Sequence, residues 1–309
     1  MNVRCTPINA ISESVLSALR EYSPFTSPTF MAILGREYGW GGFVTVCQEE
    51  KVIAAMPAVI RGKWPLARLQ ALLDGLPATI WVSGDFTTER KSIGNQMLRF
   101  IRVSGYLKAH VTDFDNALTQ SSFYGEPCNT TIIDLTTISD EFPPDKTLRA
   151  EIAKAIRDGV TVTALNRQSQ MPDFLTLVNS TEMRHGRKSK YSDRFWNEFA
   201  ELCEQDSRFS IMCVNADNHL AAAHVYICDR ESAHNWQIYF DKSFSSLKPN
   251  QAITAQAIAK FQAKGIKSLN LGATPPEATG VADYKKKWGG HEHTYPVFDF
   301  RSLLGRALP

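Results

Sequence analysis

Residues 220–272 read LAAAHVYICDRESAHNWQIYFDKSFSSLKPNQAITAQAIAKFQAKGIKSLNLG, and this stretch decides the fold. Two runs rich in apolar and aromatic residues, at 220–228 and 233–241, predict neighbouring antiparallel strands. A loop follows, and the next stretch predicts a helix over 250–264 before a further strand at 267–272. This order of strand, strand, helix and strand indicates a mixed α/β domain.

The segments on either side extend the same domain. Gly159 suits the left-handed end of a helix, and a strand follows it directly. The remaining predicted elements are helices over 147–158, 171–184, 192–204 and 281–288, and strands over 160–165, 209–215 and 293–300.

The first half of the chain repeats this order coarsely, with helices, antiparallel strands, a helix and a strand. Glu49 and Glu50 join two strands as a hairpin, and Pro143 and Pro144 interrupt any regular element. We therefore predict two domains, 1–145 and 146–309. The elements predicted in the first are helices over 11–22, 28–37 and 89–103, and strands over 43–48, 52–60, 78–82, 106–114 and 130–135.

The composition is that of a globular protein. The chain has 309 residues, of which 43% are hydrophobic and 21% charged. Its 34 basic and 32 acidic side chains leave a formal charge of +2, so no overall field indicates nucleic acid as a partner. The first residues lack the apolar core of a signal peptide, and no run is long enough to span a membrane. We expect a cytoplasmic protein without membrane insertion.

The cysteines are scattered without CxxC spacing, so we interpret them as reduced thiols. Cys213, His224 and Cys228 are the only loose group of metal-ligating residue types, and their spacing matches no zinc pattern. We therefore expect no metal site.

Five sequence segments in the second half resemble those of a known family. They are LRAEIAKAIRDGVTV at 148–162, MRHGRK at 183–188, YFDKSFSSLKPNQAITAQAI at 239–258, LNLGAT at 269–274 and ADYKKKWGG at 282–290. With these words and this order of elements, the chain resembles the tandem-GNAT FemAB-like proteins, including the group described as BioF2-like acetyltransferases. The first half matches more faintly.

The resemblance implies a mixed-sheet α/β fold of two tandem GNAT-like domains, with a degenerate N-terminal domain and the active site in the C-terminal one. FemAB-like proteins move an aminoacyl group from tRNA to an amine, while other relatives use acyl thioesters. The expected donor is therefore acyl-CoA or aminoacyl-tRNA, with no tightly bound cofactor. The expected acceptor is a small-molecule or peptide amine, and tRNA is a partner if it carries the donor.

The loop SFSSLKPNQ at 243–251 stands where a GNAT protein binds the pyrophosphate of coenzyme A, at the start of a helix. It lacks the two glycines of the usual motif. Pro249 suits a first helical turn, and Lys248 and Asn250 are candidate donor-binding residues. A plain helix start with a solvated lysine explains the loop equally well.

The strand NWQIYFD at 235–241 holds two candidate catalytic residues. Alternation predicts that Trp236, Ile238 and Phe240 face the core, while Tyr239 and Asp241 face a cleft. Tyr239 would give a proton to the leaving group, and Asp241 would orient the amine or act as its base. The alternative for Tyr239 is a structural tyrosine of the sheet whose hydroxyl is hydrogen-bonded. The alternative for Asp241 is an ordinary ion pair at the surface.

The stretch MRHGRKSKY at 183–191 is the densest cluster of positive charge in the chain. Arg184 is a candidate for binding phosphate, and His185 is a candidate base because histidine titrates near neutral pH. A solvated loop between two helices accounts for the same residues.

Within ADYKKKWGG, we assign Lys285 as the catalytic cation that stabilises negative charge on the donor or its oxyanion. Tyr284 and Trp288 of the same segment are candidate substrate-binding residues. An exposed charged helix is the alternative.

Motifs of hydrolases, kinases and dehydrogenases are missing from the sequence, and direct attack by an amine needs no nucleophilic side chain. The sequence thus favours an acyltransferase. A non-catalytic binding module on the same scaffold, for a nucleotide-linked substrate or a protein, stays open because one fold hosts many functions.

Overall fold

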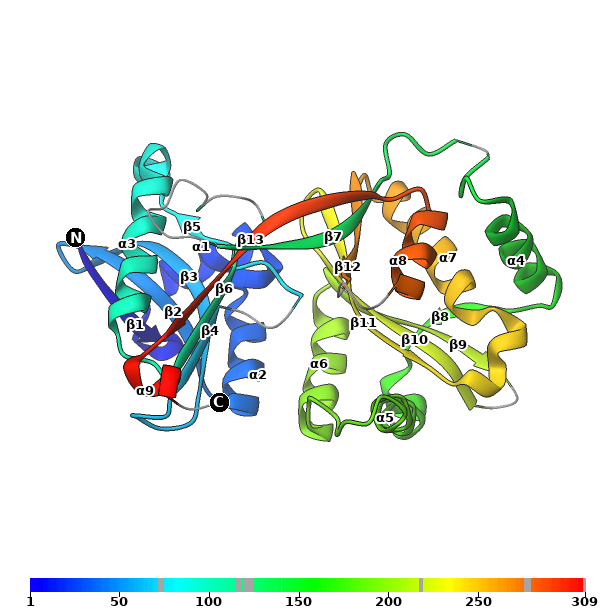
Figure 1. Ribbon diagram of the computed structural model, residues 1–309, viewed down its shortest axis with the longest axis horizontal. Helices are drawn as coiled ribbons and strands as arrows, with labels where there is room; N and C mark the ends of the chain where they lie inside the picture. Colours follow the sequence, from blue (N-terminus) through cyan, green and yellow to red (C-terminus); the bar gives the residue numbers. More distant parts are fainter. Residues whose placement is uncertain are drawn as a thin grey trace. The chain divides into compact units, whose positions relative to one another are not determined.

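The computed structural model (Figure 1) describes residues 1–71, 75–114, 118, 125–139, 141–216, 219–274 and 279–307, without the side chain of Thr279. The chain forms two compact units. Unit 1 comprises Met1–Cys128 and Thr294–Pro309, and unit 2 comprises Asn129–His293. Within the described residues, every helix is too short or too polar to cross a membrane.

Unit 1 is built on a mixed sheet with the strand order β1-β2-β3-β4-β6-β13, and β5 pairs with β3. The β4 and β6 strands run parallel, and the other neighbours run antiparallel. Glu49 and Glu50 connect β2 and β3 with φ of 47° and 65°, as a tight hairpin turn requires. The strands are β1 (Asn2–Pro7), β2 (Gly39–Gln48), β3 (Lys51–Arg61), β4 (Arg68–Ala71), β5 (Trp81–Val82), β6 (Lys108–Thr112) and β13 (His291–Arg301).

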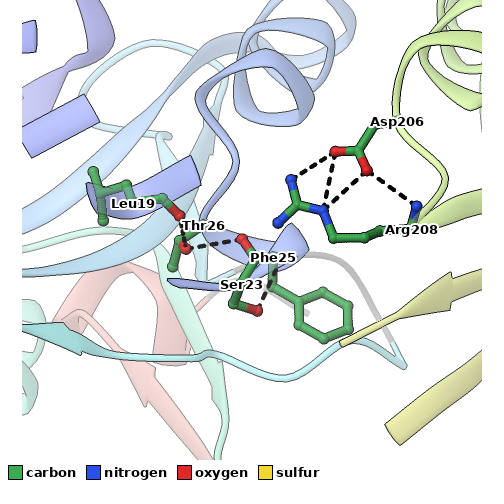
Figure 2. Close-up of polar contacts among 6 residues, drawn as sticks. All are labelled: Leu19, Ser23, Phe25, Thr26, Asp206 and Arg208. Carbon is green, nitrogen blue, oxygen red and sulfur yellow. Dashed lines mark hydrogen bonds and ion pairs between the residues drawn. The ribbon is translucent and has the colours of Figure 1, made fainter. Parts of the chain in front are cut away.

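The helices of unit 1 include α1 (Glu13–Tyr22), α2 (Pro28–Tyr38) and α3 (Arg90–Val103), with the short α9 (Leu303–Ala307) near the C-terminus. Between α1 and α2 the buried Thr26 hydroxyl lies 2.6 Å from the carbonyl of Leu19 and 3.0 Å from that of Ser23 (Figure 2). The Ser23 hydroxyl accepts a hydrogen bond from the backbone of Phe25. These bonds add to the backbone hydrogen bond from Thr26 to the carbonyl of Ser23 and fix the turn.

In unit 2 the strands of the mixed sheet have the order β7-β12-β11-β10-β9-β8. The β11 and β12 strands are parallel, and the other neighbours are antiparallel. The strands are β7 (Glu126–Asp134), β8 (Val162–Ala164), β9 (Phe209–Ala216), β10 (His219–Cys228), β11 (Ser232–Phe240) and β12 (Ser268–Ala273).

Helices cover both faces of this sheet, with α5 and α6 on one side and α7 and α8 on the other (Figure 1). Asp206 pairs with Arg208, Oδ2 to Nη2 at 2.6 Å, where the chain passes from α6 into β9 (Figure 2). The helices are α4 (Lys146–Arg157), α5 (Arg167–Arg184), α6 (Asp193–Gln205), α7 (Pro249–Ala263) and α8 (Thr279–Lys287), and η4 (Lys242–Leu247) is a 3₁₀ segment.

The predicted mixed α/β fold is confirmed, and most predicted elements lie within a few residues of the observed ones. The strands β1 and β4 were not predicted, and the strand predicted over 78–82 is reduced to Trp81–Val82. The division into domains 1–145 and 146–309 stays a prediction. The compact units divide elsewhere because β7 pairs with β12, whereas Val297–Arg301 of β13 pairs with β6.

The predicted alternation along β11 holds for the buried Trp236 and is wrong for Ile238 and Tyr239. Ile238 is 43% exposed, whereas Tyr239 is 2% exposed. The register with β10 shifts at this point, since Val225 pairs with Gln237 but Tyr226 pairs with Asn235. This bulge adds one residue to β11 and exchanges the two faces of the strand beyond it. Ile238 therefore shares a face with its cross-strand partner His224.

Candidate active site

The parallel pair β11 and β12 in unit 2 is joined only along its first residues. Three pairs connect Ser232–His234 with Ser268–Asn270, although β11 continues to Phe240 and β12 to Ala273. We call the region beyond His234 and Asn270 the strand gap. Beyond these residues the facing backbone groups of the two strands are not paired with each other.

Lys285 of α8 is bound at the β12 side of the strand gap. Its Nζ donates to the carbonyls of Gly272 (2.5 Å) and Ala273 (3.0 Å) and to the hydroxyl of Thr274 (2.8 Å). The side chain is buried, with 6% of the residue exposed, and burial lowers the pKa of its amine to about 8. The alternative of an exposed lysine on a charged helix is wrong. Lys285 is a buried cation that can lose its proton near neutral pH.

A chain of buried polar side chains leads from the strand gap to the start of α7. His224 Nδ1 lies 3.1 Å from the Tyr226 hydroxyl and 3.3 Å from Asn235 Nδ2, and Nε2 lies 3.1 Å from Asn250 Oδ1. His224 is 1% exposed, and burial lowers its pKa to about 4, so the ring is neutral at physiological pH. Asn235 Oδ1 is buried and has no hydrogen-bond partner among the described residues.

Tyr284 and Trp288 continue this buried region from α8. Their rings are 6.3 Å apart, edge to face, and Trp288 is fully buried. The Tyr284 hydroxyl and the Trp288 indole N–H make no hydrogen bond of normal geometry within the described part of the chain. Burial raises the pKa of Tyr284, while Thr254 of α7 and Trp288 lie close enough to lower it partly. Polar atoms kept without partners are costly, which points to a ligand or ordered water here.

The start of α7 carries a compensated charge. Lys248 has φ of 56° and precedes Pro249, the first residue of the helix. Its Nζ lies 2.7 Å from Glu151 Oε1 of α4, and Gln251 Nε2 donates to Glu151 Oε2 at 3.1 Å. The helix start therefore already holds a carboxylate, and Lys248 is an ion-pair partner as well as a candidate for donor binding.

Tyr239 lies in an aromatic cluster under α5 and α6. Its ring packs edge to face against Phe174 (5.9 Å between centroids) and Trp196 (5.7 Å). Burial raises its pKa strongly, and the nearby Glu182 carboxylate adds to the rise. Glu182 is itself buried and pairs with Arg187. This environment suits a structural phenol better than a proton donor working at neutral pH.

Asp241 and Arg184 lie at the end of β11, and His185 follows Arg184 at the end of α5. Asp241 Oδ1 accepts hydrogen bonds from the backbone (2.9 Å) and hydroxyl (2.8 Å) of Ser243, while Oδ2 has no described partner. Arg184 Nη1 donates to the carbonyl of Phe240 at 2.6 Å, and His185 ends α5 with an exposed side chain. A pocket of about 370 Å³ opens beside Asp241, with Asp173 also in its lining.

Comparison with known proteins shows what the part of the chain that holds this site is similar to. Residues 145–286 match the model described as an acetyltransferase (GNAT) domain. The solved structure of FemX has a TM-score of 0.68 at 12% identity, covering 99% of this chain and 98% of its own. The chain has the FemX-like tandem GNAT fold, and residues 145–286 match a GNAT domain.

Two further structures have the same fold over nearly the whole chain. The C-terminal domain of a proposed lysylphosphatidylglycerol synthetase from Agrobacterium fabrum has a TM-score of 0.60 at 13% identity, covering 96% of this chain and 93% of its own. A tandem GNAT protein from the clavulanic acid biosynthesis pathway has a TM-score of 0.55 at 8% identity, covering 96% and 97%. No curated protein sequence matches the chain significantly.

Sequence reasoning missed three polar residues of the GNAT domain, namely His224, Asn235 and Glu182. His224 was weighed only as a metal ligand. A polar residue inside an apolar run, as in AAAHVYI at 221–227, is the available signal, because burial there requires a partner. Glu182 follows the buried Phe174 and Val178 at a helical spacing of four residues and carries the same signal.

Proposed function

We propose that the chain is an N-acyltransferase that moves an aminoacyl group onto a primary amine. Transfer of a simple acyl group is the second candidate. The reaction takes place in the GNAT domain, at the strand gap. The observation that carries this proposal is Lys285, a buried amine fixed at the end of β12 that is not paired with β11. A cation in that position can stabilise the negative charge that develops on a carbonyl oxygen under attack.

The start of α7 favours a donor other than coenzyme A. The loop Ser243–Gln251 has no glycine, so its backbone cannot approach a pyrophosphate as the usual GNAT loop does. Glu151 also neutralises Lys248 and bonds to Gln251 at the same helix start. An aminoacyl ester on tRNA needs no pyrophosphate site there, and one structural neighbour is named for a product that carries a lysyl group.

The pocket beside Asp241 suits a cationic acceptor. Asp173 and Asp241 both line it, and carboxylates attract an ammonium group before it loses its proton. Asp241 Oδ2 is available to take that proton, because only Oδ1 is bound to Ser243. We therefore assign amine binding and proton removal to this end of β11.

The proposed step is a direct displacement. The amine nitrogen attacks the acyl carbon, a C–N bond forms, and the bond between the acyl carbon and the donor oxygen breaks. Asp241 first takes one proton from the bound ammonium and releases it to water, and after the attack it takes the second proton, which the nitrogen loses. The departing oxygen receives a proton from water. The three N–H groups of the Lys285 ammonium are held by Gly272, Ala273 and Thr274, so its charge stabilises the intermediate oxyanion without transferring a proton. Arg184, Lys248 and Asn250 are the candidates for holding donor phosphates.

The test measures whether the protein consumes the donor only when an amine acceptor is present. Transfer RNA charged with ¹⁴C-labelled amino acids is incubated with the protein, with and without peptides that end in lysine. We expect loss only when the amine is present, and a decrease of roughly 100-fold or more in Asp241→Asn, the usual contribution of a general base. Asp283→Asn, on the exposed side of α8, is the matched control and should keep wild-type activity.

Equal rates with and without the amine would show hydrolysis and refute the proposal. If acyl-CoA is consumed and aminoacyl-tRNA is not, the protein is still a transferase, but its donor is acyl-CoA. A non-catalytic binding module predicts no loss of either donor.

A further inference from the structure

Four basic residues lie in one row across the sheet of unit 1. Arg61 of β3 pairs with Arg68 of β4. Arg68 also pairs with Lys108 of β6, which in turn pairs with Arg301 of β13. Paired residues on neighbouring strands share a face of the sheet, with about 5 Å between their Cβ atoms, and like charges placed in this way repel each other. The row therefore destabilises the sheet unless negative charge lies beside it.

The protein supplies little of that negative charge. Asp299 lies 3.6 Å from Lys108. Arg68 and Arg301 are exposed, and neither has a carboxylate partner among the described residues. The Nε and Nη2 atoms of Arg61 have no hydrogen-bond partner in the same part of the chain. The row thus holds more positive charge than the protein compensates.

The row lies at one end of the sheet, where three chain segments meet. Leu107 donates a backbone hydrogen bond to the carbonyl of Ala67 at 2.8 Å, and Ser302 donates one to the carbonyl of Tyr106 at 3.3 Å. The helix α9 follows Ser302 directly (Figure 1). We call this surface the basic end, and it comprises residues 61–68, 103–108 and 301–307.

The basic end has positive charge and no negative charge of its own. Its three segments contain no acidic residue and six basic ones, namely Arg61, Lys63, Arg68, Lys108, Arg301 and Arg306. The whole chain has a formal charge of only +2, so this concentration is local. It creates a positive potential that attracts anionic partners to this end of unit 1.

The same segments expose a large share of the hydrophobic side chains at the surface. Ten large hydrophobic residues are exposed among the described residues, and five of them belong to the basic end. The Trp64 ring covers Gly105, where an added Cβ would lie 2.6 Å from it. Exposed apolar side chains gathered in this way mark a surface that contacts a protein or a membrane. The five are Trp64 (66% exposed), Leu66 (53%), Val103 (79%), Leu303 (85%) and Leu304 (42%).

We propose that the basic end docks the protein onto the surface of a bilayer that contains anionic lipid. The arginines and lysines contact lipid phosphates, and the side chains of Trp64, Leu66 and Leu303 enter the boundary between head groups and acyl chains. This contact is peripheral and needs no membrane-spanning helix. It does not depend on the proposed transfer reaction.

The combination of charge and apolar side chains favours lipid over other anionic partners. The phosphates of a nucleic acid would bind the arginines but would leave the leucines and Val103 in water. A second copy of this chain would bring two positively charged surfaces together, which disfavours association. A bilayer offers anionic phosphates and an apolar interior next to each other, and so matches both kinds of side chain.

Binding of the full chain to vesicles tests the proposal. Sedimentation measures the bound fraction with vesicles of phosphatidylcholine alone and with vesicles that contain about 30% phosphatidylglycerol in addition. We expect binding at least about tenfold tighter to the anionic vesicles, and loss of most of it at about 0.5 M salt, where screening shortens the range of charge attraction.

Paired substitutions separate the two parts of the surface. Arg68→Gln combined with Arg301→Gln should weaken binding about 25-fold, because each lost charge weakens it about fivefold. Leu66→Ser combined with Leu303→Ser should weaken it at least about tenfold, because less apolar area is buried. These side chains are exposed, so the variants should keep the wild-type circular dichroism spectrum.

Ile156→Ser combined with Arg157→Gln is the matched control. Both residues are exposed on α4 of unit 2, and this pair of changes removes the same kinds of side chain away from the basic end. Its affinity for anionic vesicles should equal that of the wild type.

Quenching of tryptophan fluorescence by lipids brominated in their acyl chains tests whether Trp64 enters the bilayer. We expect quenching of the wild type and loss of most of it in Trp64→Phe.

The absence of binding, or equal affinity for the two kinds of vesicle, would overturn the proposal. Weakening by the arginine changes without any effect of the leucine changes would also overturn it, because the surface would then bind phosphates alone, as one for RNA does. The vesicles contain neither an acyl donor nor a primary amine. Their binding therefore succeeds or fails separately from the proposed function, which only the transfer assay tests.

Discussion

Replacing Lys285 by methionine tests whether its amine is buried at the strand gap. The wild-type amine has a pKa of about 8 in the folded protein, against 10.5 in the unfolded chain. Between these values the unfolded chain binds more protons than the folded protein, so this group makes the free energy of unfolding rise with pH. Below pH 8 the folded protein bears the full cost of burying the charge.

At about 1.4 kcal/mol per pKa unit, the contribution of Lys285 to the free energy of unfolding grows by about 2 kcal/mol from pH 8 to pH 10. Lys285→Met lacks this contribution, and all other titrating groups cancel in the comparison. We therefore expect the wild type minus variant difference to be about 2 kcal/mol larger at pH 10 than at pH 8.

Urea unfolding of both proteins at pH 8, 9 and 10 measures this difference. Lys287→Met is the matched control, since its side chain is exposed on the same helix and has no described contact. A difference that stays constant from pH 8 to pH 10, or that shrinks, would refute the reasoning, because it would show that the amine keeps its ordinary pKa.

Three further predictions follow from single contacts. Glu151→Gln should raise the affinity for coenzyme A at least tenfold in calorimetry, since it frees Lys248 from its ion pair; an unchanged affinity would show that the carboxylate does not compete. Tyr284→Phe should change the free energy of unfolding by less than about 0.5 kcal/mol in urea, because the lost hydroxyl has no described partner; a loss above about 1 kcal/mol would reveal one. Thr26→Val should cost about 1–3 kcal/mol, because the carbonyl of Leu19 loses its hydroxyl donor in a buried turn; a shift of the urea midpoint near zero would contradict this.

The local elements of the fold could be predicted from the sequence because they depend on neighbouring residues. The hairpin at Glu49 and Glu50 and the start of α7 at Pro249 depend on backbone preferences within a few positions. The return of β13 to the sheet of unit 1 could not, because its partner β6 lies far away in the sequence. Pairing between distant strands leaves no local signal.

The candidate site was predicted in part. Lys285 was singled out from the segment ADYKKKWGG, and the structure places its amine at the strand gap. Tyr239 was expected to face the cleft, but the bulge at Trp236 exchanged the faces of β11, and such an insertion cannot be seen in a period-two pattern. His224 and Asn235 escaped notice because their roles arise from contacts between strands, which the sequence does not show.

Identifying the product by mass spectrometry tests the central claim most directly. The protein is incubated with aminoacyl-tRNA carrying a ¹³C-labelled amino acid and with a ¹⁵N-labelled lysine peptide. We predict a product whose mass is the sum of the labelled amino acid and the peptide minus water, and whose fragments place both labels on either side of a new amide bond. Recovery of only free labelled amino acid, with the peptide unchanged, would contradict the assignment of amine acylation to the GNAT domain.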